Sequence, residues 1–280
     1  MFSKMGLIVF DFCDMKTPEW LEKIFHLVVD LWFAAWPQPV PARTRLRDCK
    51  IISHRGEHDN RRVFENTLAA FERACKAGVW GLEFDLRWTK DLRPVVVHDS
   101  DLRRVFQKDL QVRQLTLHEL QSRCPLIPSL AKVIHLYGGK VHLMMELKAE
   151  VYPEPELQSR ALQAHLRHLR PQADYHFISL EPALLAHVDW CPRAACLPIA
   201  QLNVKAISTL ALQAKFGGMN GHYLLVNNTV IKRHLHDNQR IGTGFVRSGN
   251  SLFREINRGV EWIYTNHAVR LQKIRAAFLK

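Results

Sequence analysis

The order of short β-rich segments along residues 49–280 is the feature that most constrains the fold. Eight runs rich in β-branched and other apolar residues recur, and segments with helical patterns separate most of them. Alternation of this kind is typical of a parallel β/α architecture, and a count of eight favours a closed barrel. We therefore predict an α/β protein built as a (β/α)8 TIM barrel, with strands at residues 50–54, 82–86, 141–147, 175–179, 195–200, 222–227, 240–246 and 262–266.

A ninth β-like run, residues 94–98, follows the second predicted strand after only a turn. No crossover helix fits into so few residues, so this run cannot be the next parallel strand. We predict a β-hairpin at the rim of the barrel that delivers His98 and Asp99 back toward the strand ends. Between strands, residues 66–77 and 154–169 predict helices, the first with Asn66 as N-cap and Gly78 as its stop.

Residues 1–48 precede the predicted barrel and contain an amphipathic helix. Thr17 is its predicted N-cap, and the remaining surface is apolar as far as Trp36, where the Pro-rich linker begins. Its polar stripe consists of Glu19, Glu22, Lys23, His26 and Asp30. These charges exclude a membrane-spanning helix. We expect one domain boundary: helix and linker over 1–48, barrel over 49–280. The helix either packs on the barrel or contacts a membrane peripherally through residues 18–36.

The charge balance restricts the partners. The chain has 39 Lys and Arg against 27 Asp and Glu, a net charge of +12, which suits an anionic membrane surface, a phosphorylated substrate or nucleic acid. No block of five basic residues occurs, so we expect no nucleic-acid partner. The six cysteines form no C-x-x-C pair, and the first residues lack a signal-peptide pattern. We predict a cytoplasmic protein, either free or peripheral at the inner membrane.

Three carboxylates lie within otherwise apolar predicted strands. Glu83 and Asp85 are two residues apart and therefore project from one face of their strand, and Glu146 lies on the next parallel strand. The carboxyl ends of barrel strands form one mouth, where three negative charges repel each other unless a cation neutralises them. All-oxygen ligation favours Mg²⁺ or Ca²⁺ over Zn²⁺. Each carboxylate alone also fits a rim salt bridge, but together they predict a divalent-cation site.

Two histidines at the same mouth have the residue type for proton transfer. His54 ends the first predicted strand and His98 ends the hairpin return, so they form a candidate acid–base pair. Arg55 and Lys148 are next to them and can hold an anion beside a metal. This combination is typical of sites that bind phosphoryl groups and stabilise their developing charge.

These motifs resemble, in type, order and spacing, the glycerophosphodiester phosphodiesterase family of the phosphatidylinositol-phospholipase-C-like phosphodiesterase superfamily. The resemblance runs from His54 to Lys148 and rests on H-R-G-E-H-D-N, F-E-N-T-L, G-L-E-F-D-L-R-W-T-K-D-L-R-P-V-V-V-H-D and M-E-L-K. It implies a TIM barrel that hydrolyses glycerophosphodiesters to glycerol 3-phosphate and an alcohol with a divalent cation. A neighbouring glycerol hydroxyl would attack phosphorus to give a cyclic phosphate, which water then opens.

The resemblance also implies roles by position: metal ligation for Glu83, Asp85 and Glu146, acid–base catalysis for His54 and His98, phosphate contact for Arg55 and Lys148, and support of these groups for Glu65. Residues 244–250 and the pair Thr265-Asn266 depart from the family's usual W-T-V-N-D and T-D patterns, which shape the pocket for the glycerol or leaving group. Two alternatives therefore stay open: a phosphodiesterase acting on lysophospholipids at a membrane surface, and a non-catalytic barrel that binds phosphate esters.

Overall fold

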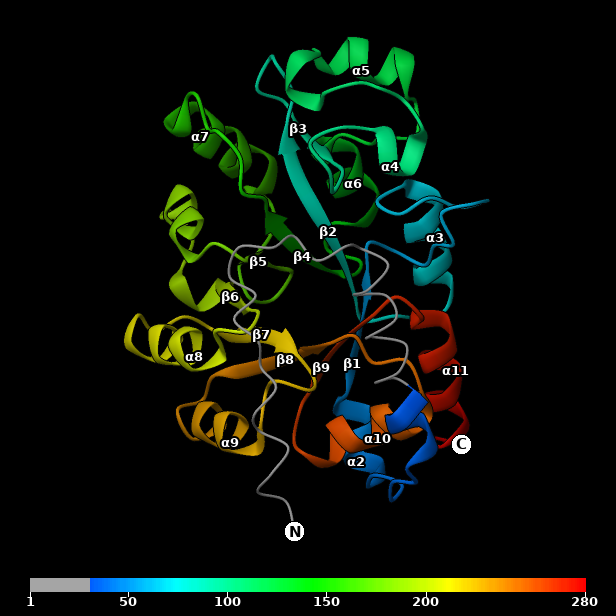
Figure 1. Cartoon of the computed structure of the whole chain (residues 1–280). Coiled ribbons are helices and arrows are strands. Elements are labelled where there is room, and N and C mark those ends of the chain that lie inside the picture. The colour runs from blue at the N-terminus through cyan, green and yellow to red at the C-terminus, as the bar shows by residue number, and fades with distance from the viewer. Residues whose placement is uncertain (1–30) are drawn as a thin grey trace.

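The structure, a computed structural model, describes residues 31–280 and contains a closed barrel of eight parallel strands (Figure 1). Strand β9 pairs with β1, and β1 pairs with β2, so the sheet closes on itself. The predicted TIM barrel is confirmed. Its strands are β1 (Lys50–His54), β2 (Gly81–Trp88), β4 (His142–Leu147), β5 (Tyr175–Ser179), β6 (Cys196–Ala200), β7 (Gly218–His222), β8 (Arg240–Gly244) and β9 (Trp262–Thr265).

The rim hairpin is also confirmed. Strand β3 (Pro94–Val96) runs antiparallel to β2, with Leu86 opposite Val96, and does not take a place among the eight parallel strands. The chain then forms a small cap over the end of β2 (Figure 1). The cap has its own apolar core, which includes Val95, Leu102 and Leu120. Its helical segments are α4 (Arg103–Phe106), η1 (Val112–Gln114) and α5 (Leu117–Arg123).

Helices surround the barrel and bury its outer face. Side chains such as Phe71 of α3 and Phe177 of β5 are fully buried between the two layers, and removal of this apolar surface from water is the main stabilising contribution. Two 3₁₀ segments, η2 (Pro182–Val188) and η3 (Arg193–Ala195), replace a regular helix after β5. The surrounding helices are α3 (Leu68–Lys76), α6 (Leu130–Tyr137), α7 (Pro155–Leu166), α8 (Val204–Gln213), α9 (Asn228–His236), α10 (Gly249–Asn257) and α11 (Ala268–Ala277).

The predicted N-cap of α3 is wrong by one residue. Thr67 is the N-cap, and its side chain accepts a hydrogen bond from the backbone N–H of Ala70. Asn66 instead has φ of 58°, a left-handed conformation that Asn tolerates better than most residues, and its amide turns toward Asp85. Gly78 follows the helix with φ of 76°, as the prediction of a stop there requires.

The predicted strand at residues 222–227 is wrong, because the strand is β7 and ends at His222. Its sequence, Gly-Met-Asn-Gly-His, has low β-propensity, whereas the run that follows is apolar and matches a strand pattern better. That run forms a turn whose Tyr223 and Val226 are nevertheless buried. Glycine is required in β7, since a Cβ at Gly218 would collide with the backbone of Arg240.

Residues 31–48 lie along α10 on the outside of the barrel. Residues 31–35 are helical, and most of the predicted helix over 17–36 lies outside the described residues. Asn250 and Asn257, at opposite ends of α10, donate to the carbonyls of Ala34 and Pro39 over 2.7 and 2.8 Å. Helix α2 (Arg43–Asp48) then packs on the barrel, and a domain boundary at residue 48 stays a prediction. Within residues 31–280, no helix is long and apolar enough to cross a bilayer.

Replacement of Gly218 by Ala tests the account of β7. Because the new Cβ would enter backbone atoms of β8, we expect Gly218→Ala to lower the free energy of unfolding by about 2 kcal/mol or more in urea denaturation. Gly249→Ala is the matched control, since a Cβ there meets only ordinary contacts with Ile274, and it should change stability by less than about 1 kcal/mol. Equal stability of the two variants would contradict this assignment.

Candidate active site

Three carboxylates meet at the carboxyl end of the barrel. Glu83 and Asp85 come from β2 and Glu146 from β4, where Asp85 and Glu146 are direct neighbours in register. One ligand oxygen from each lies within 4.8 Å of the others, and all three side chains are buried. Spacing two along a strand places alternate residues on one face, so the two β2 carboxylates both face the interior. The structure therefore brings together the three residues predicted as a metal site.

The electrostatics of this cluster favour an added cation. Burial and the charges of Asp85 and Glu146 raise the pKa of Glu83 well above its usual range. Burial and Asp85 likewise raise the pKa of Glu146. Glu83 Oε1 is buried and has no hydrogen-bond partner among the described residues. Buried carboxylate oxygens are normally satisfied, and hard divalent cations prefer oxygen ligands, so the residues present fit Mg²⁺ or Ca²⁺.

Two basic side chains already neutralise part of the cluster. Lys148 Nζ lies 2.7 Å from Glu146 Oε1 and 3.2 Å from Asp85 Oδ1, and Arg55 Nε lies 3.3 Å from Asp85 Oδ2. Although burial opposes it, Arg55 and Lys148 hold the pKa of Asp85 well below its usual range. Asn66 adds a hydrogen bond to Asp85 Oδ2 over 2.8 Å. Asp85 is thus kept ionised by two cations and one amide donor from different segments.

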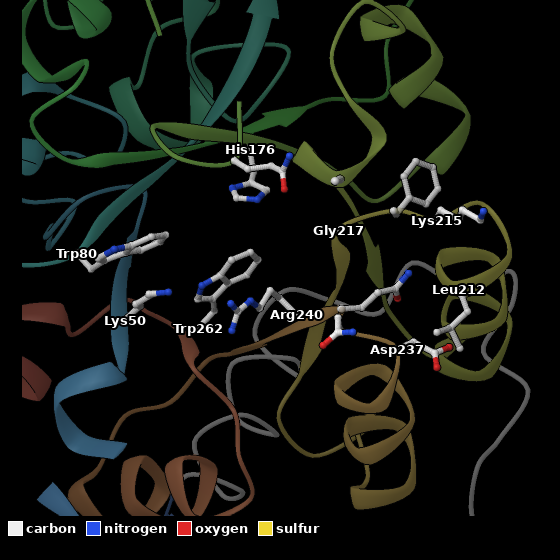
Figure 2. Close-up of a pocket in the computed structure, with 14 residues that line it drawn as sticks. Lys50, Trp80, His176, Leu212, Lys215, Gly217, Asp237, Arg240 and Trp262 are labelled. Carbon is white, nitrogen blue, oxygen red and sulfur yellow. The ribbon is translucent and has the colours of Figure 1, made fainter. Parts of the chain in front are cut away.

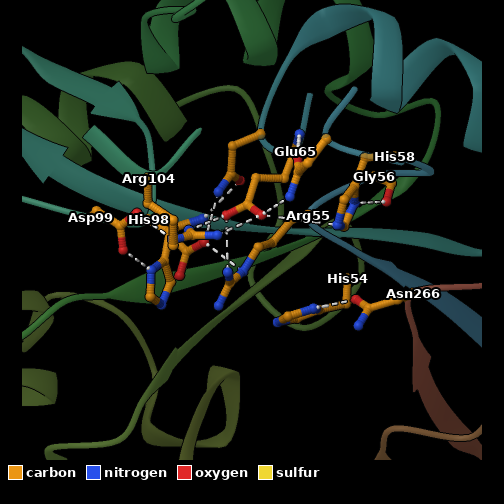
Figure 3. A network of polar contacts seen from close by, with 12 residues as sticks. His54, Arg55, Gly56, His58, Glu65, His98, Asp99, Arg104 and Asn266 are labelled. Atoms are coloured by element: carbon orange, nitrogen blue, oxygen red, sulfur yellow. Dashed lines mark hydrogen bonds and ion pairs between the residues drawn. The ribbon is translucent and has the colours of Figure 1, made fainter. Parts of the chain in front are cut away.

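Glu65 lies beside Arg55 and contacts two arginines (Figure 3). Glu65 Oε1 accepts from Arg55 Nη1 over 3.0 Å and from Arg104 Nη2 over 2.6 Å. Burial acts against ionisation, but Arg104 and Arg55 lower the pKa of Glu65 below its usual range. The ionised Glu65 therefore orients the Arg55 guanidinium toward Asp85. Arg104 comes from α4 in the cap, and no sequence signal pointed to it.

His54 places its unprotonated ring nitrogen, Nε2, near the carboxylates. Its Nδ1 lies 2.7 Å from Asn266 Oδ1, and because an amide oxygen only accepts, Nδ1 is the protonated nitrogen. Burial lowers the pKa of His54 to about 3, so the ring is neutral near pH 7. Its Nε2 lies 3.8 Å from Glu83 Oε2. A neutral imidazole with a free Nε2 in this place can accept a proton.

His98 has a different environment on the other side of Arg55 (Figure 3). Its Nδ1 lies 2.7 Å from Asp99 Oδ1, and the other oxygen of Asp99 accepts from Arg104 Nε over 2.6 Å. Arg87 Nε donates to the His98 carbonyl over 2.6 Å and fixes the backbone. The Asp99 carboxylate at Nδ1 fixes the orientation of the His98 ring and leaves Nε2 as the nitrogen for proton transfer. The two histidines thus differ in the group that orients each ring, an amide for His54 and a carboxylate for His98.

The segment that departs from the family pattern lies against His54. Phe245 packs edge-on to the His54 ring at 4.7 Å between centroids, and it is 37% exposed. Asn266, at the second departing position, is the residue that orients His54. The substituted positions therefore border the predicted acid–base residue directly.

Comparison with known proteins tests the resemblance to the glycerophosphodiester phosphodiesterases. Residues 54–189 match the model of the glycerophosphoryl diester phosphodiesterase family. The resemblance predicted from the sequence is confirmed. A glycerophosphodiester phosphodiesterase from Bacillus altitudinis is 26% identical over 251 residues, which cover 81% of this chain and 98% of that protein. One from Caldanaerobacter subterraneus is 33% identical over 126 residues, but this alignment covers only 41% of the chain and 51% of that relative.

Solved structures of family members have the same fold. The glycerophosphodiester phosphodiesterase of Thermotoga maritima matches with a TM-score of 0.67 at 22% identity and covers 81% of this chain and 98% of its own. An Oleispira antarctica phosphodiesterase in complex with the product sn-glycerol-3-phosphate matches with a TM-score of 0.66 at 21% identity, over 82% and 97% of the two chains. At these sequence identities the likeness establishes the fold of the chain, a TIM barrel.

Asn66 provides a test of the charge balance around Asp85. Because Asn66→Asp places a fourth carboxylate against Asp85 Oδ2, we expect it to lower the free energy of unfolding by about 2–4 kcal/mol in chelator-treated protein. Asn66→Gly is the matched control, since it keeps the left-handed backbone and removes the hydrogen bond alone, at about 1–2 kcal/mol. Urea denaturation measures both, and an Asp variant as stable as the Gly variant would contradict the account.

Proposed function

We propose that this chain hydrolyses glycerophosphodiesters to glycerol 3-phosphate and an alcohol in a reaction that depends on a divalent cation. The observation that carries the proposal is the meeting of three buried carboxylates with two basic side chains and two differently prepared histidines at one barrel mouth. Family membership and the product bound in the Oleispira antarctica relative support the substrate class. Phosphoryl transfer needs positioning and charge neutralisation above all, and this mouth supplies both.

Each group at the mouth has a proposed part in binding. Glu83, Asp85 and Glu146 would hold Mg²⁺ or Ca²⁺, which when bound cancels phosphate charge and lowers the pKa of a nearby hydroxyl. Arg55 and Lys148 would contact the phosphate oxygens as charge-assisted donors. The donors stay aligned before substrate arrives, because Asp85 and Glu146 already hold them in place.

The histidines would move the protons. His54 Nε2 takes the proton of the glycerol hydroxyl next to the phosphate, and that oxygen attacks phosphorus. His98, oriented by Asp99, gives a proton to the departing alcohol oxygen as the bond from phosphorus to that oxygen breaks. A cyclic phosphate results. In the second half His98 takes a proton from water and the water oxygen attacks phosphorus. The bond from phosphorus to the glycerol oxygen that attacked first then breaks, and His54 returns its proton to that oxygen.

Release of glycerol 3-phosphate from a panel of glycerophosphodiesters tests this proposal. With Mg²⁺ or Ca²⁺ we expect turnover that chelator removes, and a fall of about 10²–10⁴ in turnover for His54→Ala and for His98→Ala. His236→Ala is the control, because His236 is exposed at the end of α9 and contacts no residue of the mouth. Near-normal turnover in either catalytic variant would overturn the acid–base assignment. Cation binding without any turnover would favour the non-catalytic barrel.

A second candidate, hydrolysis of lysophospholipids at a membrane surface, is favoured by the position of two tryptophans. Trp32 and Trp36 stack at 6.2 Å and are 67% and 62% exposed. Phe33, between them, packs on Tyr223 at 5.5 Å, in the turn that follows β7 at the mouth. Phe245 borders the same mouth. Exposed indoles are typical of membrane-interface contacts, so this rim would place the site toward lipid.

Sedimentation with anionic vesicles tests the membrane candidate. Because each exposed indole would be lost from the interface, we expect Trp32→Ser combined with Trp36→Ser to lower the bound fraction about tenfold at fixed lipid. Leu235→Ser is the control, since Leu235 is 39% exposed at the last turn of α9, near the other end of the barrel. Absence of vesicle binding by the unmodified chain would contradict the membrane candidate and leave the hydrolysis of water-soluble diesters intact.

A further inference from the structure

One arginine of the cap reaches two carboxylates at the mouth. Arg104 lies on α4, and its guanidinium faces Glu65 and Asp99 (Figure 3). Arg104 Nη2 donates to Glu65 Oε1 over 2.6 Å, and Nη1 donates to Glu65 Oε2 over 3.2 Å. Its third nitrogen, Nε, donates to Asp99 Oδ2 over 2.6 Å. All three nitrogens of one guanidinium therefore bond to carboxylates from two different connections, those after β1 and after β3.

Each of the two carboxylates also holds a group of the proposed reaction. Glu65 Oε1 accepts from Arg55 Nη1 over 3.0 Å, and Arg55 is the proposed phosphate contact. Asp99 Oδ1 accepts from His98 Nδ1 over 2.7 Å, and His98 is the proposed proton donor. Arg104 is thus one side chain removed from both groups.

The carboxylates depend on Arg104 for their charge and orientation. Burial opposes ionisation of Asp99, but the hydrogen bonds from His98 and Arg104 lower its pKa. Within residues 31–280, Asp99 Oδ2 accepts a hydrogen bond from Arg104 alone. Without that bond the carboxylate could turn, and the hydrogen bond at Nδ1 determines which nitrogen of a histidine ring carries the proton. A guanidinium suits this position because its rigid fork can bond to two carboxylates at once.

The packing of the cap determines where Arg104 lies. Leu102 and Val105, on either side of it in sequence, are buried, and Leu102 belongs to the apolar core of the cap. Phe106 packs against the same core and contacts Phe64, at 5.5 Å between ring centroids. Phe64 directly precedes Glu65. The cap and the connection after β1 are therefore joined by an apolar contact beside the ion pair of Arg104.

Two other arginines form ion pairs that do not reach the mouth. Arg103, next to Arg104 on α4, pairs with Asp101 at 2.8 Å and with Asp109 at 3.6 Å. Arg240 lines a cavity of about 640 Å³ at the opposite end of the barrel (Figure 2) and pairs with Glu261 at 2.7 Å. Both arginines are suitable controls for loss of an ion pair as such.

We propose, on the basis of the reaction proposed for the mouth, that Arg104 is a positioning residue. It orients Arg55 through Glu65, and it orients His98 through Asp99. One side chain of the cap thereby aligns the group that contacts the phosphate with the group that protonates the leaving alcohol. Arg104 itself contacts neither the substrate nor the transferred proton.

Alcohol release in a single turnover, from two esters of glycerol 3-phosphate, tests this role. The ethanolamine ester has a leaving group that needs a proton, whereas the p-nitrophenyl ester releases a stable phenolate without one. We expect Arg104→Met to slow release about 10²-fold with the first ester and about tenfold with the second. Because 32% of its side-chain surface is exposed, the substitution should leave the fold intact. A general structural defect would slow both esters equally.

Four further variants separate the two effects. Glu65→Gln loosens Arg55 alone and should slow both esters about tenfold. Asp99→Asn should slow the ethanolamine ester about tenfold and the p-nitrophenyl ester less than about twofold. Arg103→Met and Arg240→Met should change neither rate by more than about twofold. The proposal is overturned if Arg104→Met releases both alcohols at the unmodified rate, or slows both by the same factor.

The ring nitrogens of His98 provide a measurement that needs no turnover. In ¹⁵N NMR spectra of the neutral ring, the unmodified chain should carry the proton on Nδ1, as the bond to Asp99 requires. Arg104→Met should give a mixture with the Nε2-protonated form, and His98→Ala identifies the signals. If neither ester is hydrolysed by the unmodified chain, the proposed function fails, and this spectrum still decides the role of Arg104. An unchanged tautomer in Arg104→Met would overturn it.

Discussion

The repulsion among three buried carboxylates at the barrel mouth is the constraint around which the other residues of the site are arranged. Burial alone would protonate Glu83, Asp85 and Glu146, and proximity adds to this tendency. The chain offsets part of the charge with Arg55 and Lys148, whose positions are fixed by the same carboxylates. The remaining negative charge suits a divalent cation, and it includes Glu83 Oε1, which has no hydrogen-bond partner within residues 31–280. The proposed binding of phosphate would use the same two basic side chains.

In this (β/α)8 barrel the same strands contribute apolar side chains to the core and, at their carboxyl ends, charged side chains to the site. Outward-facing side chains bind the helices in one large apolar core, whereas inward-facing ones alternate along each strand. A layer of buried apolar side chains, Ile52, Met144, Ile178 and Leu197, fills the middle of the barrel and stabilises it. Strands therefore carry the charged groups of the mouth. The two residues that contact the His54 ring, Phe245 and Asn266, come from the connections after β8 and β9.

Period-two alternation and residue type made much of this predictable from the sequence, and the misses have physical causes. Glu83, Asp85 and Glu146 stood out as charges within apolar strands, and the short turn before His98 allowed only a hairpin. Strand β7 was missed because its glycines are required by backbone approach, which apolar patterning does not record. Arg104 reaches Glu65 only through the fold of the cap, and Asn66 looked like a helix cap because Asn favours both positions.

The most direct measurement of the central claim is calorimetric titration of chelator-treated protein with Mg²⁺ and with Ca²⁺. If these carboxylates require a cation, at least one of the two ions should bind at one saturable site per chain. Glu83→Gln and Asp85→Asn should each abolish this binding. Glu72→Gln, which removes an exposed carboxylate paired with Lys76, should bind as the unmodified chain does. Absence of binding for both ions, or binding that survives Glu83→Gln unchanged, would contradict a cation site at the mouth.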